Sequence, residues 1–90
     1  MIDYIEALRI AENYVQHLAE VANDDFQIIL EDTKEVEKGW LFFFNTSEFI
    51  KSGNQLYALA GNGPFLVRRN ADVCQLPSSP DWKEVLDIID

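Results

Sequence analysis

The sequence has very few of the side chains that carry most enzyme chemistry. Its 90 residues include one cysteine, Cys74, and one histidine, His17. A single cysteine excludes an intramolecular disulfide and a cysteine-based metal site, and it fits a reducing compartment. A catalytic pair would need His17 with Cys74 or a serine, but His17 falls among polar helix positions and Cys74 in a short apolar strand. We therefore predict a protein that is not an enzyme and uses no cofactor or metal.

Basic residues are also scarce, with 7 Lys and Arg against 16 Asp and Glu, for a net charge of -9. Proteins that bind nucleic acid need clustered basic side chains to neutralise phosphates, so this charge excludes that class. The acidity lies toward both ends: residues 1–37 carry ten acids and two bases, 38–70 one acid and four bases, and 71–90 five acids and one base. A basic partner fits this distribution, and solubility alone is the other explanation.

Long apolar runs are missing as well. No stretch approaches the roughly 18 apolar residues of a membrane span, and the first residues lack the basic and apolar regions of a signal peptide. The sequence predicts a cytoplasmic protein with no membrane segment. At 90 residues it is expected to form a single domain over 1–90.

The most regular pattern is a helix from about residue 3 to residue 23. Apolar residues recur there at helical spacing: Tyr4, Ile5, Leu8, Ala11, Val15, Leu18 and Ala22. Asp3 can cap the helix, and Glu6 three residues later completes a pattern like a capping box. Asn23 to Asp25 ends it.

Four strands are expected, at 26–36, 40–44, 65–69 and 73–76. The first begins with alternating Phe26, Ile28 and Leu30, and the second is apolar on both faces, as in a strand covered on both sides. Lys38 and Gly39 form a turn, residues 70–72 form a hairpin turn, and Pro77 ends the last strand.

The remaining segments are predicted to continue the second strand and to form the other helices. Residues 47–50 extend or end the second strand. Residues 55–60 form a short helix, which Gly61 to Pro64 end. Ser78 to Asp81 start a C-terminal helix. The fold class is α+β: a four-stranded antiparallel sheet with the N-terminal and C-terminal helices on one face, and a short helix between strands 2 and 3. The Arg68-Arg69 doublet is interpreted as edge protection or internal pairing rather than an anion site.

The eleven aromatic residues leave two interpretations open. Some can be exposed on an open face of the sheet and contact a partner, or both faces of the sheet are covered.

The sequence resembles the immunity protein 35, or YrhB-like, family. The residues that carry the resemblance are the Gly39-Trp40-Leu41-Phe42-Phe43-Phe44 strand, Gly53, and the run Leu59-Ala60-Gly61-Asn62-Gly63-Pro64-Phe65-Leu66-Val67. The hairpin after the third strand departs from the family, which carries a glycine where this chain has 69–73. The resemblance implies a small bacterial protein that neutralises a cognate toxin of a polymorphic toxin system by direct binding.

A basic toxin would meet the acidic end of the first strand. The residues predicted to bind the partner are Asp24, Asp25, Glu31, Asp32, Glu35, Glu37 and Tyr57. The alternative function is a small chaperone-like or stress-related protein that holds unfolded clients. The sequence also leaves open whether an edge strand pairs two copies into a homodimer.

Overall fold

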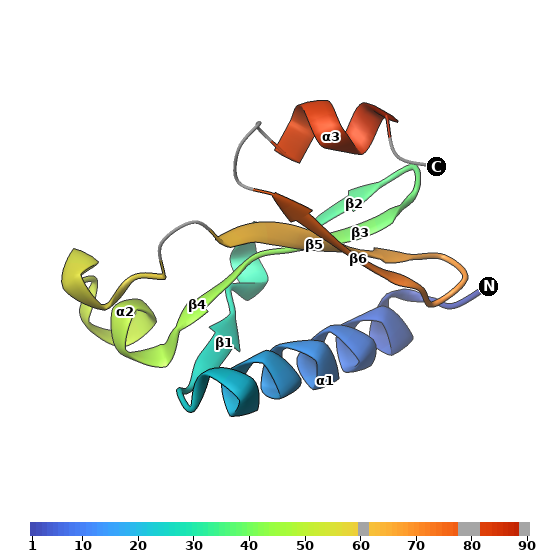
Figure 1. The fold of residues 1–90 in the computed structure, drawn as a ribbon. Coiled ribbons are helices and arrows are strands. Elements are labelled where there is room, and N and C mark those ends of the chain that lie inside the picture. Colours follow the sequence, from blue (N-terminus) through green and yellow to red (C-terminus); the bar gives the residue numbers. More distant parts are fainter. Residues whose placement is uncertain (60–61, 78–81, 89–90) are drawn as a thin grey trace.

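The computed structural model describes residues 1–59, 62–77 and 82–88, and it has the predicted α+β class (Figure 1). The elements in chain order are α1 (Tyr4–Ala22), β1 (Phe26–Ile28), the 3-10 helix η1 (Leu30–Asp32), β2 (Lys34–Val36), β3 (Gly39–Phe42), β4 (Phe44–Thr46), α2 (Ser47–Ser52), the 3-10 helix η2 (Gln55–Tyr57), β5 (Asn62–Arg68), β6 (Val73–Pro77) and α3 (Trp82–Ile88). No helix within these ranges is long and apolar enough to cross a membrane.

Helix α1 begins and ends where its local signals predict. The Asp3 carboxylate accepts a hydrogen bond from the Glu6 backbone N–H at 2.9 Å, and the chain leaves the helix at Asn23, which has a φ of 54°. The capping box is only half formed, because the Glu6 carboxylate pairs with Arg9 instead of returning to the Asp3 N–H. The buried side chains of α1 are Ala7, Ala11, Val15 and Ala19, and these small residues let the helix pack close to the sheet.

The predicted first strand, 26–36, is not continuous. Its two ends pair with the consecutive strands β4 and β3 in different registers. Ile28 lies opposite Phe44, whereas Lys34 lies opposite Leu41. Residues 29–33, five in number, therefore face only residues 42 and 43 on the other side. The three extra residues are accommodated by η1, a turn inserted between β1 and β2.

The main sheet has four antiparallel strands, as predicted, in the order β2-β3-β5-β6. The predicted second strand, 40–44, is divided between β3 and β4, and β4 pairs with β1 in a separate two-stranded sheet that was not predicted. The hairpin turn at 70–72 is confirmed, with Ala71 at a φ of 79° and its N–H donating to the Arg68 carbonyl. Gly39 starts β3 at a φ of 152°, and a Cβ atom there would lie 2.1 Å from the Val67 carbonyl oxygen. Only glycine fits this close approach of two strands.

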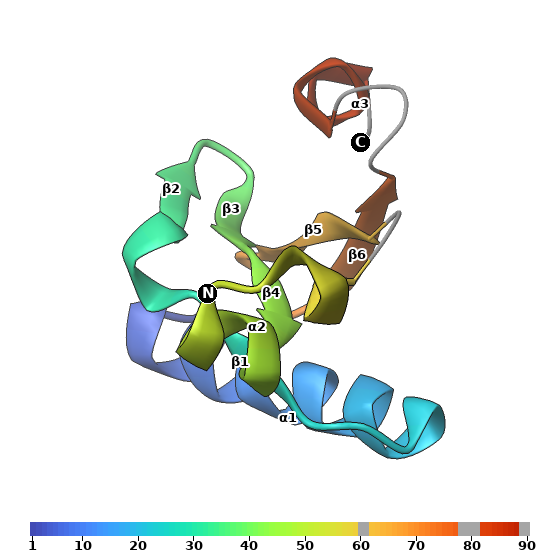
Figure 2. The same cartoon turned by 90° about the vertical axis from the view of Figure 1, so that its left-hand side faces the viewer.

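The N-terminal and C-terminal helices cover opposite faces of this sheet, so the expectation that both pack on one face was wrong (Figures 1 and 2). The buried sheet residues that pack with α1 are Trp40, Phe42, Phe44, Phe65 and Val67. The residues of the second cluster, which includes two side chains of α3, are Leu41, Leu66, Leu76, Val85 and Leu86. Because successive side chains of a strand point to opposite faces, the apolar residues of β3 and β5 require a cover on each side.

The segment after β4 is more helical than expected. Residues 47–50 belong to α2, which Thr46 caps by accepting from the Phe49 N–H at 3.0 Å, and Gly53 ends it at a φ of 72°. The short helix predicted at 55–60 is only the 3-10 turn η2. Residues 60 and 61 and the predicted start of the last helix at 78–81 lie outside the described residues.

Candidate functional site

The predicted acidic side chains line the outer edge of the molecule along one stretch of chain. We call this set the acidic edge: Asp24, Asp25, Glu31, Asp32, Glu35 and Glu37. All six side chains are exposed. Among the described residues, β1 pairs with β4 in the two-stranded sheet, and β2 is the edge strand beside β3 in the four-stranded sheet, so the stretch carries an edge strand of each sheet. The six exposed carboxylates are therefore accessible to a second protein.

Backbone hydrogen bonds hold the first two members of the acidic edge in place. The Asp24 N–H donates to the Ala19 carbonyl at 2.9 Å, which ties the loop to the end of α1. The Asp25 carbonyl accepts from the Ser47 N–H at 2.9 Å, which ties the loop to the start of α2. Both carboxylates therefore project from an ordered loop, and binding there requires little additional ordering.

Glu31 and Asp32 lie on η1, the turn that the register change creates. The Asp32 N–H donates to the Ile29 carbonyl at 3.0 Å, and the Thr33 N–H donates to the Leu30 carbonyl at 3.2 Å. Leu30 starts this turn with 58% of its surface exposed. The two charges thus directly follow an exposed apolar residue in the middle of the stretch that carries the acidic edge.

Glu35 and Glu37 sit beside Arg69, which confirms internal pairing for one arginine of the doublet. The Arg69 guanidinium donates to the Glu35 carboxylate at 3.2 Å and to the Val36 carbonyl at 2.8 Å, and its Nε donates to the Glu37 carbonyl at 3.1 Å. Glu35 is the one member of the acidic edge with an ion pair in the described part of the chain. Its charge is therefore less available to a partner than that of Glu31 or Asp32.

Tyr57 does not lie on the stretch that carries the carboxylates. It belongs to η2, and its backbone carbonyl accepts from the Thr46 hydroxyl at 2.7 Å. Thr46 is the β4 residue opposite Phe26 of β1. Tyr57 is therefore separated from the acidic edge by β4 and α2, although 48% of its surface is exposed and accessible to a partner.

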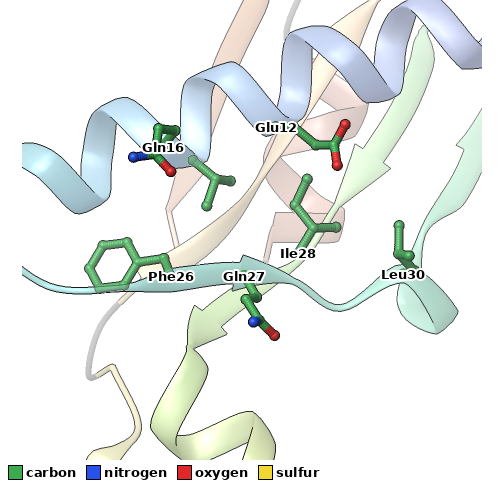
Figure 3. Close-up of a pocket in the computed structure, with 7 residues that line it drawn as sticks. Glu12, Gln16, Phe26, Gln27, Ile28 and Leu30 are labelled. Atoms are coloured by element: carbon green, nitrogen blue, oxygen red, sulfur yellow. The ribbon is translucent and has the colours of Figure 1, made fainter.

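Two hollows lie beside Leu30, and that side chain lines both of them. The first hollow, of about 340 Å³, is formed by α1 and β1 and is lined by Glu12, Val15, Gln16, Phe26, Gln27, Ile28 and Leu30. Figure 3 shows Glu12 reaching from α1 toward Ile28, while Gln27 points away from the helix. The second hollow, of about 330 Å³, is lined by Tyr4, Leu30, Thr33, Glu35 and Trp40. Each hollow is lined by a mixture of apolar and neutral polar residues and by one carboxylate.

Sequence reasoning missed Glu12 and Leu30 as surface features. Leu30 continues the alternation of Phe26 and Ile28, so the sequence predicts it on the same side of one strand as these two residues. The charged run directly after it, Glu31 and Asp32, was the one available sign that the strand ends there. Glu12 carried no signal, because a charge on the polar face of an amphipathic helix is ordinary.

The side chains considered for catalysis are not brought together. His17 is exposed on α1, whereas Cys74 is half-buried and packs with Leu41 and Leu66 on the opposite face of the sheet. Burial raises the pKa of the Tyr14 hydroxyl, and the nearby Cys74 thiol adds to this rise. Within residues 1–59, 62–77 and 82–88, no three His, Cys, Asp or Glu side chains form a group that could hold a metal ion.

The aromatic side chains are mostly covered. Both faces of the four-stranded sheet have a helix packed on them, which decides between the two interpretations of the aromatic content. Among the described aromatic side chains, only Tyr4 and Tyr57 are exposed. The described surface therefore offers isolated rings rather than an open aromatic face.

Comparison with known proteins gives a family and a relative. The chain matches the family model described as Immunity protein 35 over residues 5–88. A curated relative, the uncharacterized protein YrhB of Escherichia coli (strain K12), is 28% identical over 71 residues, which cover 79% of this chain and 69% of the relative. No solved structure matches.

Proposed function

Because the chain belongs to the immunity protein 35 family, we propose that it neutralises a cognate toxin by binding it directly in the bacterial cytoplasm. The match over residues 5–88 carries this proposal, since it includes nearly the whole chain. Neutralisation of this kind needs no catalytic group in the immunity protein. A complex that covers the toxin's active site, or blocks access of its substrate, is sufficient.

The proposed binding surface is the acidic edge, with Tyr57 as a peripheral contact. Its exposed carboxylates and the net charge of -9 favour a basic toxin. Complementary charge accelerates encounter between proteins and disfavours wrong partners, so a basic toxin would associate fast and selectively. The backbone hydrogen bonds along 24–33 support the proposal, because an ordered surface loses little conformational entropy on binding.

The proposal is tested with the toxins encoded beside this chain's gene. Each toxin is expressed in cells with and without the chain, and each purified toxin is titrated with the chain by calorimetry. We expect one toxin to be neutralised in cells and to form a tight stoichiometric complex in solution. If no neighbouring toxin is neutralised and none binds, the proposed function is wrong.

The chaperone-like alternative predicts a different surface and a different result. A protein that holds unfolded clients needs a broad exposed apolar area, and Tyr4 and Tyr57 are isolated rings. Suppression of aggregation of several unrelated heated proteins, with no selective toxin complex, would favour this alternative.

A further inference from the structure

Leu30 is the exposed apolar residue whose surroundings point most clearly to a partner. The register change between β1 and β2 moves it out of the strand alternation and onto the first position of η1. More than half of its surface is exposed, and it forms a wall of both neighbouring hollows. Exposed leucine alone is common, but leucine between two concave sites has the arrangement of an interface anchor.

Among the described residues, each of the two hollows has one charged lining residue, but only the first carboxylate is unpaired. In the first hollow, Glu12 is the one charged lining residue, and it has no ion pair in the described part of the chain. In the second hollow, Glu35 is the one charged lining residue, and it shares its charge with Arg69. The rest of the lining is apolar or neutral. A long basic side chain matches the first hollow, because the aliphatic stem covers apolar surface while the charged head reaches the Glu12 carboxylate. In the second hollow, Arg69 already pairs with Glu35 and lies over the Trp40 ring.

We propose that a basic protein docks on Leu30 with an apolar side chain and places a Lys or Arg side chain in the first hollow, against Glu12. The identity of this protein as the toxin rests on the proposed function. The carboxylates in the hollows and along Glu31 and Asp32 repel phosphate groups, so nucleic acids and anionic membranes do not fit this site. The centre of the interface then lies at η1 and α1, while Asp24, Asp25 and Tyr57 lie at its rim.

The first test compares matched substitutions in binding to the neutralised toxin. Leu30→Ala removes the anchor, and Leu56→Ala removes another exposed leucine, on η2. Glu12→Gln removes the first carboxylate, and Glu20→Gln removes another exposed carboxylate two turns further along α1. We expect Leu30→Ala and Glu12→Gln each to weaken binding about tenfold or more, as at interface hot spots, and both controls to bind like the wild type. Equal affinity for all four variants would overturn the proposal.

The second test uses a small probe, so that it does not depend on the toxin. N-acetylarginine amide is titrated into the isotope-labelled chain, and amide shifts are followed by NMR. We expect shifts that saturate at millimolar probe and concentrate at residues 27–35 and around Glu12, and we expect Glu12→Gln to remove those of the first hollow. Shifts spread over all acidic residues would overturn the proposal.

The two proposals can fail separately. If a toxin binds tightly and is indifferent to Leu30→Ala and Glu12→Gln, the function stands and this docking site is wrong. If no toxin binds, the proposed function is wrong, and the arginine titration alone decides whether the first hollow accepts a basic side chain.

Discussion

The Tyr14 hydroxyl donates a hydrogen bond to the Gln75 side-chain oxygen at 2.7 Å, which joins the middle of α1 to the edge strand β6. The other end of the same amide donates to the carbonyls of Gly63 and Pro64 at 3.0 and 3.1 Å. These carbonyls lie where the β5-β6 register shifts between Asn62 and Phe65. The Gln75 side chain thus donates to the carbonyls at the register shift and accepts a hydrogen bond from α1.

Replacing Gln75 with alanine should destabilise the fold. The Gly63 and Pro64 carbonyls lose their donor and Tyr14 loses its acceptor, and each polar group left unsatisfied costs about 1–3 kcal/mol when no water replaces the partner. We expect a loss of about 2 kcal/mol in the free energy of unfolding, measured by urea denaturation. Gln27→Ala, at an exposed strand glutamine with no hydrogen bond of this kind, is the control and should change stability by less than about 0.5 kcal/mol. Equal effects of the two substitutions would contradict this role of Gln75.

Tyr14 should make the fold sensitive to alkaline pH. Burial raises its pKa in the folded protein, with a further contribution from Cys74, so the folded state favours the neutral phenol. Its contribution to stability is fully present below the unfolded pKa of about 10 and is lost as pH rises through the higher folded pKa. Unfolding free energies measured from pH 8 to pH 11.5 should fall more steeply for the wild type than for Tyr14→Phe. Tyr57→Phe is the control and should follow the wild type.

Arg69 should not be replaceable by lysine. Its guanidinium lies 4.8 Å from the centre of the Trp40 ring while it donates to the Val36 and Glu37 carbonyls, and a single ammonium group cannot keep this planar arrangement. We expect Arg69→Lys to lower the free energy of unfolding by about 1 kcal/mol. Arg68→Lys, at the neighbouring position in β5, should have little effect. If Arg69→Lys and Arg68→Lys are equally stable, the contacts of Arg69 with the Trp40 ring and the two carbonyls do not contribute to stability.

Charge reversal on η1 should slow association with the toxin. Glu31→Lys with Asp32→Lys changes the local charge by four units at the centre of the acidic edge, and the rate constant for association at low salt should fall about tenfold. The salt dependence of that rate should weaken as well. The matched control is Glu84→Lys with Asp87→Lys on α3, two exposed acids on the other face of the sheet. Similar rates for the two variants would indicate that steering comes from the net charge rather than from this edge.

The predictions from sequence succeeded where the deciding interaction is local. The start of α1 depends on Asp3 and Glu6, three residues apart, and the turn at 70–72 depends on neighbouring residues. They failed at residues 26–36, because the alternation of Phe26, Ile28 and Leu30 is regular up to Leu30. The interruption there follows from the register of β1 and β2 against β3 and β4, which the local pattern does not contain.

The sequence by itself determined the α+β class, the presence of a four-stranded antiparallel sheet, the scarcity of catalytic groups and the excess of acids. Because the strand at 40–44 has apolar residues on both faces, the sequence already predicted that both faces are buried. Only the tertiary structure decided that α1 and α3 lie on opposite faces, and only it brought Glu12 beside Leu30 and Arg69 over Trp40. These residues are far apart in the chain, and their positions depend on how the sheet and the helices pack. Burial of apolar surface is not directional, so the arrangement of the elements is decided by the shapes of the packed side chains and by strand register.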